Sequence, residues 1–172
     1  MWNTLSRMLH TGLLTEPLSV PAQTAPTLEI LQKDLLEIFG RALCIRHVDA
    51  GSCNGCELEI QALNNPYYNL EGAGIKFVAS PRHADLLLVT GPVSVNMEEA
   101  LKRTYDAMPD PKWVLAIGDC GACGGVFGTS YASRGDVANI IPVNDTVLGC
   151  PPSPASILGG ILQMIRSTGI EA

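Results

Sequence analysis

The sequence has few aromatic residues, few charged residues and a shortage of basic ones. Of 172 residues, 5% are aromatic and 16% are charged; 11 Lys and Arg against 17 Asp and Glu give a net charge of −6. Nucleic-acid binding depends on basic surface and gains from aromatic rings that stack on bases. This composition therefore argues against a nucleic-acid-binding protein. The low charge also predicts that part of the surface is covered by other proteins.

Long apolar runs are absent as well. No stretch of 18 consecutive apolar residues occurs, and no positively charged secretory leader is visible. We therefore expect a protein that stays on the cytoplasmic side and does not cross the membrane. The apolar content of 47% excludes a disordered chain, and 172 residues suffice for one domain with a substantial core.

Two regions differ in pattern, and we predict a boundary between residues 1–41 and residues 42–172. Residues 1–15 have apolar side chains at helical spacing, residues 16–26 hold three prolines typical of a linker, and a second helix is expected from Thr27 to Phe39. The first helix either packs on its own domain or docks on a partner. We interpret residues 1–41 as a helical docking segment with a Pro-rich linker.

From residue 42 onward, strands and helices alternate. Strands are predicted at 42–48, 75–79, 85–90, 113–118 and 146–148, and helices at 57–64, 95–108 and 154–165. Continuously apolar strands separated by helices indicate a parallel sheet that is covered on both faces. The fold class is therefore α/β.

Six cysteines carry the chemical signal. Cys44 lies inside the first strand and is predicted to be a small core residue. The others form two C-x₂-C pairs, Cys53 with Cys56 and Cys120 with Cys123, and a lone Cys150 before a proline. This spacing fits an iron–sulfur cluster with four thiolate ligands, a zinc site or a reactive dithiol.

The cysteine loops follow the carboxyl ends of three predicted strands, where open α/β sheets bind ligands. We therefore expect the loops to converge on one shared site, which argues against a fourth possibility, scattered and inert buried thiols. The spacing, with Cys150 before a proline, favours the cluster over the zinc site and the dithiol. Cys53, Cys56 and Cys150 are the clear candidates for its ligands. Spacing alone leaves the fourth open between Cys120 and Cys123, with a modest preference for Cys120.

Four ordered motifs resemble one known family. They are residues 51–59 (GSCNGCELE), 80–92 (SPRHADLLLVTGP), 118–120 (GDC) and 149–152 (GCPP). Together they resemble the small subunit of membrane-bound, energy-converting or formate-hydrogenlyase-like [NiFe] hydrogenases, which is homologous to the 20 kDa subunit of respiratory complex I. In complex I the first two cysteines are adjacent, whereas Asn54 and Gly55 separate them here, and this difference favours the hydrogenase group.

The resemblance implies a flavodoxin-like domain holding one [4Fe–4S] cluster through Cys53, Cys56, Cys120 and Cys150, with Cys123 left out. It further implies an electron-transfer subunit without bond-making catalytic residues. The implied partners are a nickel–iron large subunit, a ferredoxin-like iron–sulfur subunit and a membrane subunit resembling the complex I H subunit. The alternative is a complex I-like quinone oxidoreductase module without hydrogenase activity.

Five further polar residues have two interpretations each. Glu57 and Glu59 are either acids that favour the start of a helix or groups on a proton path or subunit interface. Arg82 and His83 are either solvated loop residues or contacts to a large or membrane subunit. Asp119, beside Cys120, is interpreted as a turn-forming residue rather than a proton carrier.

Overall fold

The computed structural model describes residue 33 and residues 40–169, which form a parallel five-stranded sheet. In sheet order its strands are β2 (Ile75–Phe77), β1 (Leu43–Asp49), β3 (Leu86–Thr90), β4 (Trp113–Ile117) and β5 (Asp145–Val147). All four strand pairs are parallel, so every strand ends at the same edge. The order 2-1-3-4-5 is that of flavodoxin-like folds, whose strand order reverses between β1 and β3. The predicted fold class is confirmed.

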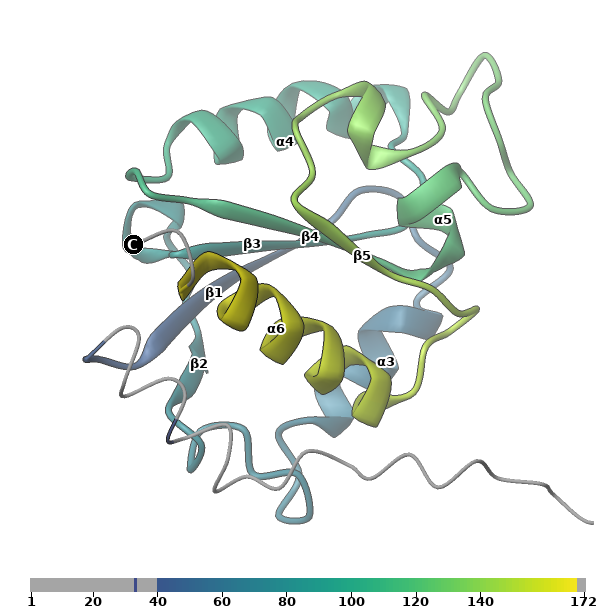
Figure 1. The fold of residues 1–172 in the computed structure, drawn as a ribbon. Coiled ribbons are helices and arrows are strands. Elements are labelled where there is room, and N and C mark those ends of the chain that lie inside the picture. Colours follow the sequence, from purple (N-terminus) through teal and green to yellow (C-terminus); the bar gives the residue numbers. More distant parts are fainter. Residues whose placement is uncertain (1–32, 34–39, 170–172) are drawn as a thin grey trace, which may run out of the picture.

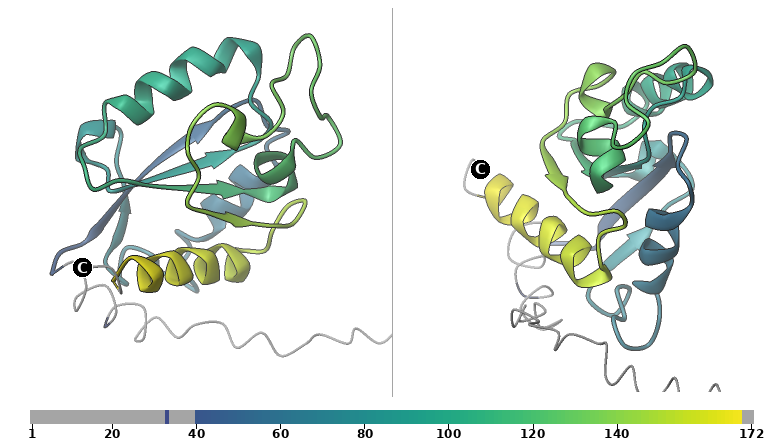
Figure 2. Two further views of the ribbon diagram at one scale, coloured as in Figure 1. Left: turned by 45° about the horizontal axis from the view of Figure 1, so that its top comes forward. Right: turned by 90° about the vertical axis from the view of Figure 1, so that its right-hand side faces the viewer.

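Helices cover both faces of the sheet (Figure 1). Helices α3 (Gly55–Ala62) and α6 (Pro154–Gly169) lie on one face, and α4 (Val95–Asp106) lies on the other. The short helix α5 (Gly118–Cys123) directly follows β4, and the second view shows it at the same end of the sheet as α3 (Figure 2). Within the described part of the chain, no helix has the length and apolarity needed to cross a bilayer.

Local sequence explains the two longest helices. In α4, the ion pairs Lys102–Glu98 and Arg103–Glu99 join residues one turn apart on the exposed side. At the start of α6, Ser153 Oγ accepts a hydrogen bond from the Ser156 backbone N–H at 3.2 Å, which satisfies a donor that the helix leaves unpaired. The apolar side chains of α6 recur at helical spacing and are buried against the sheet.

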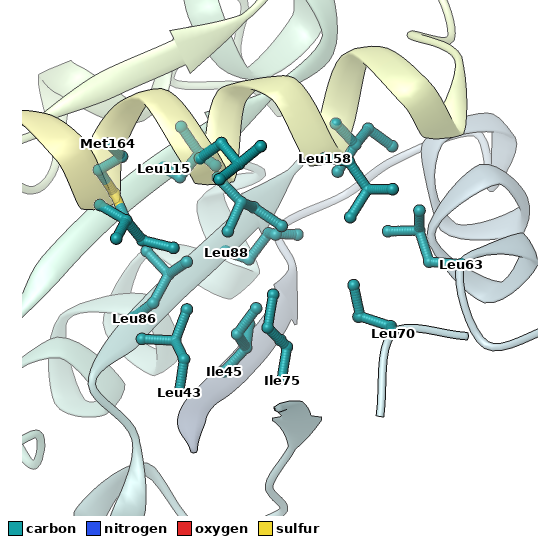
Figure 3. Close-up of a cluster of buried hydrophobic side chains, with 14 of the residues drawn as sticks. Leu43, Ile45, Leu63, Leu70, Ile75, Leu86, Leu88, Leu115, Leu158 and Met164 are labelled. Atoms are coloured by element: carbon teal, nitrogen blue, oxygen red, sulfur yellow. The ribbon is translucent and has the colours of Figure 1, made fainter. Parts of the chain in front are cut away.

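The larger core lies between the sheet and the layer formed by α3 and α6. Leu158 and Met164 of α6 pack over Leu86, Leu88 and Leu115 of the central strands (Figure 3). On the opposite face, a second core joins β3 and β4 to α4 and to the 3₁₀ helix η2 (Val137–Asn139). All five residues of β3 are fully buried because both of its faces are covered.

The prediction for Cys44 was wrong. Its side chain is only half-buried and lies outside both core clusters, although its neighbours Leu43 and Ile45 are fully buried. Alternate residues of a strand face opposite sides of the sheet. The connection from β2 to β3 forms only the 3₁₀ helix η1 (Pro81–His83), so it adds no full helix beside the face that carries Cys44.

Strand and helix positions otherwise follow the expectations to within a few residues. The structure adds α5, η1 and η2, which the sequence patterns did not predict. The predicted helices and linker of residues 1–39 lie outside the described residues, apart from Lys33. Arg41 belongs with the sheet, because its guanidinium donates to the Asp85 carboxylate, which also accepts the Cys44 backbone N–H.

Replacing Leu88 with Ala is expected to lower the free energy of unfolding by roughly 2–5 kcal/mol, because the fully buried side chain leaves a cavity under α6. Urea unfolding of the purified chain measures the change. Leu58→Ala is the matched control, since Leu58 is 57% exposed and its loss should cost less than about 0.5 kcal/mol. Equal losses for the two variants would contradict the core described above.

Candidate metal centre

Three segments bring cysteines to the carboxyl edge of the sheet. The turn after β1 leads to Cys53 and Cys56, α5 after β4 carries Cys120, and the loop after β5 carries Cys150. In Figure 1, α5 and the start of α3 lie at this same end of the sheet. Cys53 and Cys150 are exposed, whereas Cys56 and Cys120 are half-buried.

A network of hydrogen bonds around Asp49 shapes the first of these segments. Asp49 Oδ1 accepts the backbone N–H groups of Gly51 at 2.9 Å and Ser52 at 2.8 Å, and Ser52 Oγ accepts the Asn54 N–H. Burial opposes ionisation of Asp49, but the hydrogen bonds from Ser52 and Gly51 outweigh it and hold the pKa of this carboxyl below its usual value. Asp49 is therefore a carboxylate at neutral pH and fixes the turn that leads into Cys53.

Helix α5 separates the roles of Cys120 and Cys123. The thiol of Cys120 interacts electrostatically with those of Cys150 and Cys53 and, more weakly, with that of Cys123, and Cys123 Sγ donates back to the Asp119 carbonyl at 3.2 Å. The Cys56 thiol likewise interacts with Cys120, Cys53 and Cys150. The thiols of Cys53, Cys56, Cys120 and Cys150 thus lie near enough to interact, and Cys123 lies near Cys120 while its thiol also bonds within its own helix.

Two glycines allow the backbone to approach the thiols closely. Gly118 has a φ of +82°, and a Cβ at this position would lie 2.7 Å from Cys56 Sγ. Gly125 has a φ of +53°, and its Cβ would lie 2.7 Å from Cys120 Sγ. Any other residue at either position would add backbone strain and push a thiol out of place.

The thiols share one electrostatic problem. Burial raises the pKa of Cys56 to about 12, and the negative charges of Glu57, Cys120, Cys53 and Cys150 add to this effect. Burial also raises the pKa of Cys120, assisted by Cys150 and Cys53. Four thiolates at this edge would repel one another, and bound metal cations would remove that penalty because coordination deprotonates a thiol outright.

The donor set therefore fits an iron–sulfur cluster. Among residue 33 and residues 40–169, no three His, Cys, Asp or Glu side chains are arranged to hold a single metal ion. A cluster of four irons and four sulfides takes four thiolate ligands, and Cys53, Cys56, Cys120 and Cys150 match it in number and in ligand chemistry.

Sequence patterns did not predict that polar side chains are buried or half-buried beside this site. Glu57 is in the first turn of α3, as the dipole interpretation expects, but it is only 7% exposed and neither carboxylate oxygen has a hydrogen-bond partner. His47 of β1 pairs through Nε2 with Thr90 Oγ1 at 3.0 Å. Burial lowers the pKa of His47, while Glu57 and Asp49 oppose that shift.

Two of the remaining polar candidates, Arg82 and His83, are not brought to the cysteines. Arg82 and His83 are exposed in η1, which precedes β3 and therefore lies near the opposite end of that strand. Glu59 is half-buried on α3. Their proposed contacts with other subunits stay predictions.

Large apolar side chains are exposed near the three cysteine segments. Leu58 follows Cys56 by two residues, Leu148 precedes Cys150 by two, and Val126 and Phe127 follow Gly125; their exposed fractions are 57%, 67%, 93% and 59%. Exposed apolar groups that gather at one place mark protein interaction sites. The cysteine edge thus combines a set of candidate metal ligands with exposed apolar side chains suited to contact another protein.

This molecule is a flavodoxin-like α/β protein with a cysteine-lined edge. Residues 53–164 match the family described as NADH ubiquinone oxidoreductase, 20 Kd subunit. The chain belongs to this family, as its sequence motifs predicted.

Relatives come from two kinds of complex. The chain is 48% identical over 132 residues to the probable membrane-bound hydrogenase subunit mbhJ of Pyrococcus furiosus, covering 77% of this chain and 79% of that protein. It is 41% identical to formate hydrogenlyase subunit 7 of Escherichia coli, covering 85% of this chain and 57% of the relative. Identity is 46% over 110 residues to an NADH-quinone oxidoreductase subunit of Herpetosiphon aurantiacus, covering 63% of this chain and 61% of the relative.

A solved structure of the archaeal membrane-bound sulfane sulfur reductase contains a similar chain. The TM-score is 0.64 at 32% sequence identity, and the match covers 80% of this chain and 76% of that one. The similar proteins are therefore subunits of oxidoreductase complexes that their names describe as membrane-bound hydrogenases, quinone oxidoreductases or a sulfur reductase.

Replacing Gly118 with Ala is expected to lower the free energy of unfolding by roughly 1–3 kcal/mol, because the new methyl group meets Cys56 Sγ and the backbone has a positive φ. Chemical denaturation under reducing conditions measures the change. Gly121→Ala in the same helix is the control, since its Cβ would make only ordinary contacts, the nearest at 3.5 Å. If both variants unfold like the parent, Cys56 is not packed against Gly118.

Proposed function

We propose that this chain is the electron-transfer subunit of a membrane-bound [NiFe] hydrogenase complex. One [4Fe–4S] cluster, held by Cys53, Cys56, Cys120 and Cys150, connects a nickel–iron large subunit to a ferredoxin-like subunit. The observation that carries the proposal is the gathering of these four thiols, from three segments, at one edge of a domain whose family consists of oxidoreductase subunits.

The residues of this chain bind and shield; they break no bonds. The four thiols would ligate the irons, and Gly118 and Gly125 leave space beside two of them. A bound cluster supplies one-electron transfer. Asp49 fixes the first cysteine turn, and the half-burial of Cys56 and Cys120 limits contact with water on the domain side.

Partner subunits would cover the open side of the site. Electron transfer weakens steeply with distance, so the large subunit is expected to contact the exposed cysteine edge. Leu58, Leu148, Val126 and Phe127 supply an uncharged, apolar contact surface there. We place the subunit peripherally on the cytoplasmic face, attached through a membrane subunit that resembles the complex I H subunit.

A second candidate is a complex I-like oxidoreductase module without hydrogenase activity. The similarity to the sulfane sulfur reductase chain and the 46% identity to an NADH-quinone oxidoreductase subunit favour it. The C-x₂-C spacing of Cys53 and Cys56 favours the hydrogenase. The two candidates differ in whether the large partner subunit contains nickel.

The test is metal analysis and low-temperature EPR of the complex purified through a tag on this chain. We expect the site on each copy of this chain to hold about four irons and about four sulfides, and to give a spin-one-half signal after dithionite reduction. We also expect nickel in the complex. Iron and the signal without nickel would establish the complex I-like module instead. Zinc in place of iron, or the absence of any paramagnetic signal, would overturn the cluster.

Replacing Cys120 with Ser is expected to remove the EPR signal of this cluster, because a four-iron cluster needs all four of its thiolates. Cys123→Ser should leave the signal and the iron content unchanged, because Cys123 bonds to the Asp119 carbonyl of its own helix. EPR and iron analysis of the two purified complexes make the comparison. Loss of the signal in the Cys123 variant alone would exchange the two assignments.

A further inference from the structure

One residue joins two of the cysteine segments. The Asp119 backbone N–H donates to the Gly149 carbonyl at 2.9 Å, and the Gly149 N–H donates to Asp119 Oδ1 at 2.8 Å. Asp119 thus pairs both polar backbone groups of a residue that lies thirty positions away in the sequence. It directly precedes Cys120, and Gly149 directly precedes Cys150.

The two bonds differ in what they require. Any non-proline residue at position 119 could donate its backbone N–H to Gly149. The second bond needs a short side chain with an acceptor, which Asp and Asn provide and Ala does not. The carboxylate acceptor also makes this a charge-assisted hydrogen bond, which is stronger than a neutral one.

Asp49 forms hydrogen bonds within one cysteine segment, whereas Asp119 forms them between two. Asp49 accepts N–H groups from within the turn that follows its own strand, so it shapes one segment. Asp119 links the segment after β4 to the segment after β5, next to Cys120 in the first and to Cys150 in the second. The adjacent strands β4 and β5 already bring the segments near each other, and the two Asp119–Gly149 hydrogen bonds connect them directly.

We propose that Asp119 is a positioning residue that holds Cys120 and Cys150 at the separation required to ligate one cluster. The inference rests on the proposed function and deepens it. The relevant group is the side-chain acceptor at position 119, and its charge has a separate effect. A carboxylate next to a ligand disfavours the reduced, more negative cluster, so Asp119 also lowers the reduction potential.

The two effects separate in two variants of the purified complex. Asp119→Ala removes both the acceptor and the charge, and iron retention against a chelator is expected to fall on the order of 10-fold or more. Asp119→Asn keeps the acceptor oxygen and loses the charge; it should retain iron and the EPR line shape of the parent, with a higher reduction potential. If the Asn variant retains iron like the parent and has a higher reduction potential, a merely structural role of Asp119 would not explain the result.

Asp110→Ala is the matched control, because Asp110 is an exposed carboxylate that precedes β4 and so lies at the other end of that strand. It should change neither iron retention nor the potential. Equal iron retention in the Ala variant and the parent would overturn the proposal. So would equal loss from the Asn and Ala variants.

A metal-free measurement makes the result independent of the cluster. In the full chain with Cys44, Cys53, Cys56 and Cys123 replaced by Ser, only Cys120 and Cys150 can react. A short thiol-specific cross-linker should join them severalfold more slowly in the Asp119→Ala version than in the Asp119→Asn version or the parent. Circular dichroism verifies that each version is folded.

Iron analysis and cross-linking distinguish a failure of the proposed function from a failure of the role of Asp119. If the wild-type complex holds no iron, the proposed function is wrong, while a slower cross-link in the Ala variant still supports Asp119 as the residue that sets the thiol separation. If the cluster is present but cross-linking rates and iron retention are the same in all variants, the proposed function stands and the role of Asp119 is overturned.

Discussion

The parallel direction of the five strands is the constraint on which the site depends. Cys53, Cys120 and Cys150 are separated by dozens of residues, and they meet because each follows a strand that ends at the same edge. An antiparallel partner strand would deliver its cysteine to the opposite edge. The buried β3, which lies between β1 and β4 in the sheet, maintains this alignment through its pairing with both.

Without a metal, the charged forms of the thiols at this edge are electrostatically unfavourable. Burial and mutual repulsion raise the pKa of Cys56 to about 12, so the metal-free site favours protonated thiols. Glu57 adds negative charge and finds no hydrogen-bond partner within the described chain. Coordination to iron would relieve the repulsion among the thiols, because each thiolate would share its charge with a metal cation. The thiols that repel one another in the isolated edge are thus the same groups that would ligate the proposed cluster.

Sequence alone predicted the scaffold well, and the limits have physical causes. The uninterrupted apolar run of β3 and the cysteine pairs placed after strands were sufficient to predict a parallel sheet with a site at one edge. Spacing could not separate Cys120 from Cys123, since both are close to the strand end, and the bond from the Cys123 thiol to the Asp119 carbonyl depends on α5, which the sequence patterns did not predict. The Asp119–Gly149 bonds and the burial of Glu57 depend on contacts between distant segments, which local patterns do not contain.

The segment between α5 and η2 reaches outward from the sheet, yet it is held firmly (Figure 1). Arg134 pairs with Glu98 of α4, and the Val95 N–H donates to the Ala132 carbonyl. Tyr131, next to these anchors, is 99% exposed. Because the anchors already restrict the backbone, a protein that binds this segment loses little conformational entropy in doing so. Assembly at this surface would then resemble the docking of two rigid bodies more than folding upon binding.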